Sequence, residues 1–133
     1  MQHNPASAKN PMKWMEIARA DLAIADMPLP PGGMYEQLCF HAQQAAEKSI
    51  KAVLLYLGVE FPFTHNLQLL LDLLPSEISI PAEIEDVIEL NAYAVLTRYP
   101  GELEPASRSD YDRALKIAKA TLAWAEGIVC GRQ

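Results

Sequence analysis

The sequence lacks the residues and motifs that most metal, redox and membrane proteins need. It has two cysteines, Cys39 and Cys130, and no CxxC pair for a zinc cage or redox site. Cys39, His41 and His65 have no metal-ligand spacing, so we expect no metal and no cofactor. No apolar run approaches the roughly 20 residues that span a bilayer. The polar start MQHNPASAKNPMKW has no apolar segment of a secretory signal. We expect a cytoplasmic protein with no membrane contact.

Common enzyme fingerprints and a broad basic surface are also lacking. There is no GxxxxGK[ST], GxGxxG, HExxH or GxSxG motif. The net charge is −6, and residues 77–104 hold seven acids with Arg98 as their only base. This balance excludes a wide surface for duplex nucleic acid. The charge balance does not exclude a local basic site made of Lys48, Lys51, Arg98 and the last segment. The acidic stretch can increase solubility or bind a basic partner.

Helical periodicity is what the sequence does have. Strand signals are weak, and 133 residues suit one domain. We expect helices over about 12–25, 34–57, 81–97 and 109–129, with a short one between a cap at Thr64 or Asn66 and Leu74. Such apolar stripes can only be buried against one another. The predicted fold class is all-α: an up-and-down four-helix bundle with an additional short helix, covering 12–130 after a flexible 1–11.

Two of these helices carry specific expectations. In 81–97, the residues expected to face inward are Ile84, Val87, Ile88, Val95 and Leu96. Asn91 falls on the same stripe, as a structural polar residue. The last helix is expected to start near Ser109, with Asp112 at the spacing of a capping box.

A polar row follows the second helix. His41, Gln44, Lys48 and Lys51 are spaced by three, four and three residues, which places them on one face. The lysines could contact phosphate, and His41 with Gln44 could hydrogen-bond to a base or ribose. The alternative is a solvated stripe opposite the alanines of this helix, and periodicity alone favours that alternative.

Three further polar residues are candidates. Arg98, in TRYPGE, could bind phosphate at a helix end or pair with Asp21 or an acid of its own helix. Asp21 lies close to an apolar stripe, so we expect a structural cross-helix pair with Lys48 or Arg98. His65, in THNL, is expected to cap or support a turn.

Four segments together resemble the HEPN domain, the higher eukaryotes and prokaryotes nucleotide-binding family. They are MKWMEIARADLAIADM, CFHAQQAAEKSIKAVLLYLG, FPFTHNLQLLLDLL and YAVLTRYPGE. The resemblance implies a four-helix up-down bundle with a short extra helix, usually a homodimer. It also implies a gene often adjacent to a minimal nucleotidyltransferase, as in a toxin–antitoxin or stress-defence module.

One part of the family pattern is missing. Many HEPN proteins are metal-independent ribonucleases with an arginine, a polar residue and then a histidine. Arg98 resembles that arginine, but Leu103, Glu104 and Pro105 stand where the histidine belongs. The motif therefore lacks its general acid–base, and we do not transfer the ribonuclease activity.

Three functions remain after this comparison. We expect a module that binds a nucleotide, RNA or a nucleotidyltransferase partner through Lys48, Lys51 and Arg98, with His41 and Gln44 beside them. The second is a ribonuclease in which His41 or Tyr99 works with Arg98 in place of the missing histidine. The third is a structural protein whose acidic segment 77–104 docks a basic partner.

Overall fold

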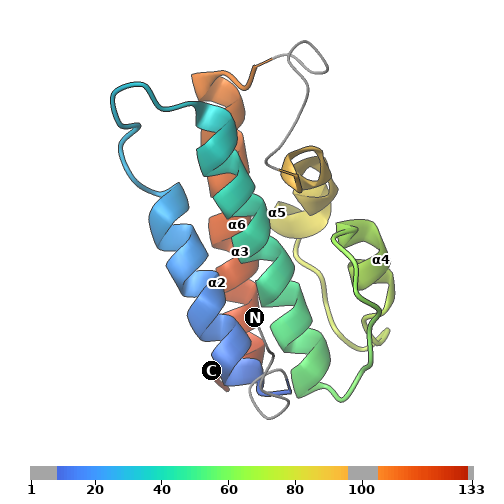
Figure 1. The fold of residues 1–133 in the computed structure, drawn as a ribbon. Helices are drawn as coiled ribbons and strands as arrows, with labels where there is room; N and C mark the ends of the chain where they lie inside the picture. Colours follow the sequence, from blue (N-terminus) through green and yellow to red (C-terminus); the bar gives the residue numbers. More distant parts are fainter. Residues whose placement is uncertain (1–8, 96–104, 132–133) are drawn as a thin grey trace.

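The protein is built from helices that alternate in direction. The computed structural model describes residues 9–95 and 105–131, and no strand occurs among them. The elements are α2 (Pro11–Ala25), α3 (Tyr35–Tyr56), α4 (Leu67–Asp72), α5 (Ala82–Glu85), the 3-10 helix η1 (Asp86–Tyr93) and α6 (Arg108–Val129). Figure 1 shows α2, α3 and α6 side by side, with α5 and η1 at the fourth position and α4 outside them. The predicted all-α up-and-down bundle with an additional short helix is confirmed. None of the described helices combines the length and apolarity needed to cross a bilayer.

Small residues allow α3 to pack closely against its neighbours. α3 contributes buried Ala42, Ala46 and Ala52, and α2 faces it with Met15 and Ala18. Helix separation depends on side-chain size at the contact, so alanines bring the backbones close. α3 thereby becomes the central helix, in contact with α2, α4, η1 and α6. Polar side chains on α3 are consequently covered by neighbours on more than one side.

The end of α3 follows its sequence signal. Gly58 adopts a φ of 74°, which is a left-handed conformation that glycine accepts without strain. The Val59 N–H donates to the Leu54 carbonyl at 2.8 Å, and the Gly58 N–H donates to the Leu55 carbonyl at 3.0 Å. This hydrogen-bond pair is a Schellman motif, and it turns the chain toward α4.

The predicted fourth helix is shorter and differently wound than expected. Its α-helical part is limited to the four residues of α5, and the 3-10 helix η1 follows. A 3-10 helix has three residues per turn, so residues three apart share a face. Ile84, Val87 and Leu90 are accordingly buried, whereas Ile88 is 38% and Val95 is 58% exposed. The inward assignment of Ile88 was wrong because it assumed the α-helical period, and that of Val95 was wrong because the helix ends at Tyr93. Leu96 lies outside the described residues.

The start of α6 also differs from the prediction. Ser107, not Ser109, is the N-cap: its side chain accepts from the Asp110 N–H at 3.0 Å. The Asp110 carboxylate in turn accepts from the Ser107 N–H at 2.9 Å. The predicted capping box is present, but it begins two residues earlier than expected. The pair Ser107 and Asp110 has the same three-residue spacing as the predicted pair Ser109 and Asp112.

Candidate functional site

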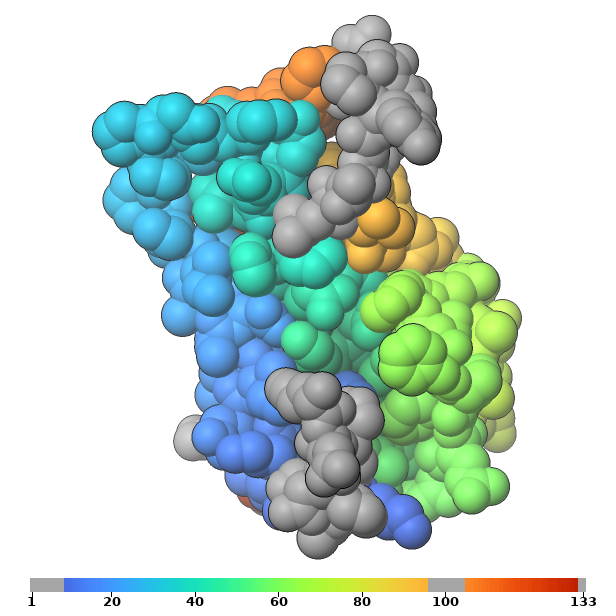
Figure 2. Space-filling view, in the orientation of Figure 1, coloured from blue at the N-terminus to red at the C-terminus, as the bar shows by residue number. Residues whose placement is uncertain are grey.

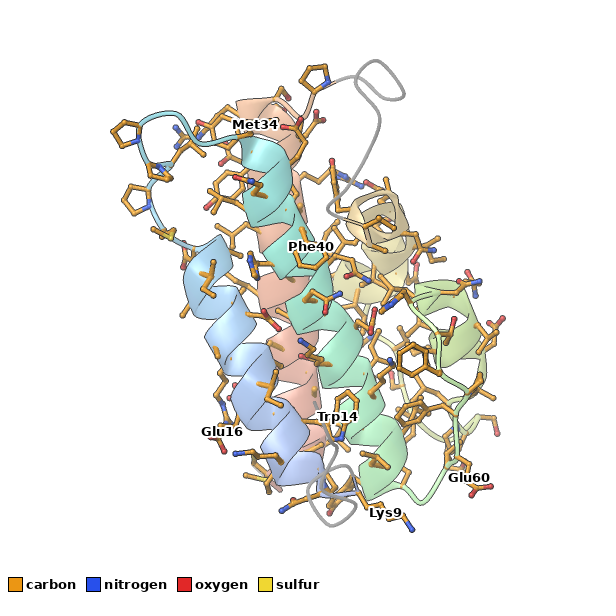
Figure 3. All side chains as sticks on the ribbon, viewed as in Figure 1. Lys9, Trp14, Glu16, Met34, Phe40 and Glu60 are labelled. Atoms are coloured by element: carbon orange, nitrogen blue, oxygen red, sulfur yellow. The ribbon has the colours of Figure 1, made fainter. Side chains whose placement is uncertain are left out.

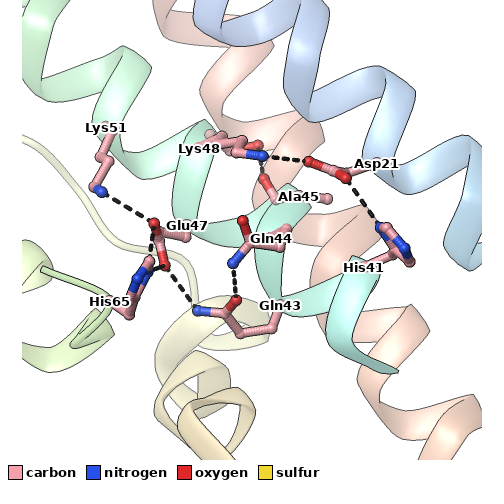
Figure 4. Close-up of polar contacts among 10 residues, drawn as sticks. Asp21, His41, Gln43, Gln44, Ala45, Glu47, Lys48, Lys51 and His65 are labelled. Atoms are coloured by element: carbon pink, nitrogen blue, oxygen red, sulfur yellow. Dashed lines mark hydrogen bonds and ion pairs between the residues drawn. The ribbon is translucent and has the colours of Figure 1, made fainter. Parts of the chain in front are cut away.

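The polar row on α3 is only partly open to solvent: Lys51 is buried, whereas His41, Gln44 and Lys48 are partly exposed. Only 5% of Lys51 is exposed, and its neighbours Gln43 and Glu47 are 0% and 2% exposed. Figure 4 shows that the polar side chains divide into two clusters, one beside α2 and one beside the segment before α4. The solvated-stripe alternative is therefore wrong for Lys51. Helical periodicity predicted that this side chain faces solvent, but neighbouring segments on both sides of α3 bury it.

The first cluster joins α2 to α3 and is named here the Asp21 cluster, made of Asp21, His41 and Lys48. The Lys48 ammonium donates to Asp21 Oδ2 at 2.7 Å, and His41 Nδ1 lies 3.1 Å from Asp21 Oδ1. The three side chains are 13%, 28% and 22% exposed for Asp21, His41 and Lys48. Of the two partners expected for Asp21, Lys48 is in contact and Arg98 lies outside the described residues. All three side chains of the cluster are therefore partly exposed to solvent.

The second cluster surrounds a buried carboxylate and is named the Glu47 cluster: Gln43, Glu47, Lys51 and His65. Glu47 accepts from Lys51 Nζ at 3.0 Å, from Gln43 Nε2 at 3.0 Å and contacts His65 Nδ1 at 2.9 Å. Gln44 joins the cluster because its Nε2 donates to Gln43 Oε1 at 2.7 Å. An ionised carboxylate is tolerated in the interior when donors surround it in this way.

Three aromatic rings enclose the Lys51 ammonium. The ring centroids of Trp14, Phe61 and Phe63 lie 5.7, 5.6 and 5.9 Å from Nζ. Cation–π attraction at these distances adds to the ion pair with Glu47. Figure 3 shows Trp14 of α2 beside the lower part of α3, where this enclosure forms. Lys51 therefore ties α2, α3 and the following loop together, and its charge is already neutralised.

A groove adjoins the Asp21 cluster. It lies between the end of α2, the loop over residues 26–34 and the start of α3, and it has a volume of about 240 Å³. This end of the molecule forms the upper left of Figure 2. Its walls are mainly apolar, with two polar side chains, Gln37 and His41, on the α3 side. Apolar walls with a few convergent polar groups are typical of small-molecule sites.

The structure assigns contacts to the remaining candidates. Asn91 accepts from the Leu67 N–H at 3.0 Å, so it joins η1 to α4. Asn66, rather than Thr64, caps α4 by accepting from the Gln68 and Leu69 N–H groups. His65 supports the same turn through Glu47. Arg98, together with Tyr99 and Pro100, lies outside the described residues.

The sequence prediction missed Glu47. The family resemblance included Gln43 in its pattern on the second helix but gave it no contact. Gln43 lies four positions before Glu47, and Glu47 lies four positions before Lys51. A glutamate four residues before a lysine is a recognised helical pair, and this spacing could have identified Glu47.

Charges outside the two clusters are mostly paired. The Arg113 guanidinium donates to Glu89 at 2.6 Å and to Asp86 at 3.2 Å, which lowers the pKa of Glu89.

Burial raises the pKa of the Cys39 thiol to about 11, so it stays protonated near neutrality. Across residues 9–95 and 105–131, no group of His, Cys, Asp and Glu side chains gathers as metal ligands would.

Comparison with known proteins identifies the family. The family model for the HEPN domain matches residues 12–128. A crystal structure of TT1696 from Thermus thermophilus is 33% identical, with a TM-score of 0.74 over 87% of this chain and 95% of that one. The structure of ST0689, an archaeal HEPN homologue, is 28% identical, with a TM-score of 0.68 over 90% and 98%. No curated protein matched the sequence. The chain belongs to the HEPN domain family.

Proposed function

We propose that this HEPN protein binds a nucleotide or single-stranded polynucleotide beside the Asp21 cluster and does not cleave it by the family's arginine–histidine chemistry. The observation that carries the proposal is the groove of about 240 Å³, with His41 shared between its wall and the cluster. A base can enter the apolar part of the groove, while Gln37 and His41 offer hydrogen bonds to its edge.

Phosphate is assigned to Lys48 in this proposal. The Lys48 side chain is 22% exposed, and Lys48 follows His41 by seven residues, which is two turns of α3. The proposal adds Arg98 on the family resemblance alone. Lys51 was expected to contact phosphate too, but its ammonium is enclosed by rings and Glu47, so its role in the proposal is to hold the frame of the site.

Asp21 makes the proposal testable in two directions. In the free protein the Lys48 ammonium donates to the Asp21 carboxylate. A phosphate that binds Lys48 would have to compete with this carboxylate. Calorimetric titration with ATP, GTP and a short RNA should give weaker binding for Lys48→Met, by about tenfold. Asp21→Asn should bind as tightly as the wild type or more tightly, because the competing charge is gone. Lys116→Met, an exposed lysine on α6, is the matched control.

Two results would overturn the nucleotide-binding proposal. One is the absence of binding by any of the three ligands. The other is binding that Lys48→Met and Lys116→Met weaken equally, since that would indicate nonspecific attraction to positive charge.

The cellular setting is proposed from the family. We infer a cytoplasmic homodimer that works with a minimal nucleotidyltransferase in a toxin–antitoxin or stress-defence system. Co-expression with a neighbour-encoded nucleotidyltransferase, followed by size-exclusion chromatography with light scattering, tests both assemblies. A monomer that elutes apart from the enzyme would contradict this setting.

One observation favours ribonuclease activity as a second candidate. His41 is held at Nδ1 by Asp21, and a carboxylate on one ring nitrogen orients the other for acid–base chemistry. In that candidate Arg98 stabilises the phosphate and His41 replaces the missing histidine. Purified protein should then cleave total RNA, and both Arg98→Ala and His41→Ala should abolish cleavage. Cleavage that survives both substitutions would count against it.

A further inference from the structure

The loop between α3 and α4 carries an aromatic side chain that the fold leaves in solvent. Phe63 is 92% exposed, whereas Phe61, two residues before it, packs against the core. Pro62 stands between them and fixes its own φ, which limits the conformations of the loop. Phe63 therefore lies outside the core, and although its ring centroid is 5.9 Å from the Lys51 ammonium, the ring stays almost fully open to solvent.

His65 stands beside this ring in a fixed orientation. The two ring centroids are 6.0 Å apart, with an interplanar angle of 69°. His65 Nδ1 contacts the buried Glu47 carboxylate at 2.9 Å, while the side chain is 52% exposed. The contact with an acceptor places the Nδ1 proton toward Glu47, which leaves Nε2 as an outward acceptor in the neutral ring.

We propose that Phe63 and His65 form a second site, which binds one unpaired nucleobase of a single-stranded nucleic acid. The base stacks on the Phe63 ring, and an N–H of its edge donates to His65 Nε2. Aromatic side chains with a nearby hydrogen-bonding group are a common arrangement for unstacked bases. The Glu47 cluster acts as the support, since it fixes both the imidazole and the loop.

The surroundings of Phe63 favour a base over a protein partner. A protein anchor usually belongs to a continuous apolar patch around a pocket. The rings of Phe61, Trp14 and Phe63 instead gather around the Lys51 ammonium, and the residues that follow Phe63 are Thr64, His65 and Asn66. An exposed ring with charged and polar neighbours suits a flat ligand that has a polar edge.

This inference rests on the proposed function. A fluorescent base analogue in the RNA detects stacking on Phe63 separately from binding at the groove. A short single-stranded RNA containing 2-aminopurine reports stacking by loss of fluorescence. We expect quenching with the wild type, about tenfold weaker binding with Phe63→Ala and retained binding with Phe63→Trp. Tyr56→Ala is the matched control, because Tyr56 is an aromatic residue of α3 that is 51% exposed.

The outcomes distinguish the second site from the groove. Binding weakened by Lys48→Met but not by Phe63→Ala would overturn the stacking site and leave the proposed function intact. Binding weakened by Phe63→Ala but not by Lys48→Met would support the stacking site and overturn the groove. Equal effects of Phe63→Ala and Tyr56→Ala would also overturn the stacking site.

Discussion

Removal of the Glu47 carboxylate is predicted to be among the most damaging single changes in the protein. Glu47→Ala would leave the Lys51 ammonium without its anion, on a side chain that is 6% exposed, and would leave the Gln43 amide without its acceptor. Breaking a buried ion pair from one side costs about 3–5 kcal/mol, against about 5–15 kcal/mol for a whole domain. The predicted loss is therefore a large fraction of the total stability.

Two further variants show how much of the stability loss comes from an unpaired buried charge. Lys51→Met keeps an unbranched apolar side chain among the three rings and leaves Glu47 its contacts with Gln43 and His65, so we expect a smaller loss than from Glu47→Ala. The double variant Glu47→Gln/Lys51→Met should lose less than the sum of its single variants, by about 1–3 kcal/mol, because it leaves no unpaired charge.

Urea unfolding followed by circular dichroism measures these free energies, with the slope m as a check on two-state behaviour. Glu16→Ala is the control, since its pair with Lys13 is exposed at 3.4 Å and should cost less than about 0.5 kcal/mol. A loss below about 1 kcal/mol for Glu47→Ala, or strict additivity in the double variant, would refute a buried and coupled cluster.

Three further predictions concern local features. Ser107→Ala should lower the free energy of unfolding by about 1 kcal/mol and Ser109→Ala by less than about 0.5 kcal/mol, as measured in urea; the reverse order would place the cap at Ser109. At pH 8 a thiol reagent should modify Cys130 in the folded protein and Cys39 only after unfolding, because burial holds the pKa of Cys39 near 11; rapid modification of both would contradict this. Arg113 lowers the pKa of Glu89, so this pair stabilises the protein above about pH 4.3 and the effect is lost as the pH falls through the lowered value. Arg113→Ala should therefore reduce the acid dependence of stability, and an unchanged pH profile would count against the pair.

Periodicity and turn residues predicted the bundle because they act locally. The helical spacing of Met15, Ala18, Leu22 and Ala25 predicts one buried stripe, and all of them are buried except Leu22, which is partly buried. Gly58 ends α3, as a glycine after a helical pattern predicts. The winding of η1 could not be read with an α-helical period, although the three-residue spacing of Ile84, Val87 and Leu90 was present in the sequence.

The candidate site was harder to predict because it depends on what covers α3. A row of polar residues at helical spacing has the same pattern whether it meets solvent or a neighbouring helix. Asp21 lies 20 residues before His41, and His65 lies 18 residues after Glu47, so only the fold brings each pair together. Charge alone indicated Lys48 or Arg98 as the partner of Asp21, and Lys48 is the one in contact. Nothing in the sequence indicated that aromatic rings would surround Lys51.

We propose that this HEPN protein binds nucleic acid beside the Asp21 cluster without cleaving it. The most direct measurement mixes purified protein with an end-labelled single-stranded RNA, follows fluorescence anisotropy and then resolves the same RNA on a denaturing gel. We expect a saturable rise in anisotropy that Lys48→Met weakens, with the RNA intact throughout. No rise in anisotropy, or cleavage that Arg98→Ala abolishes, would contradict it.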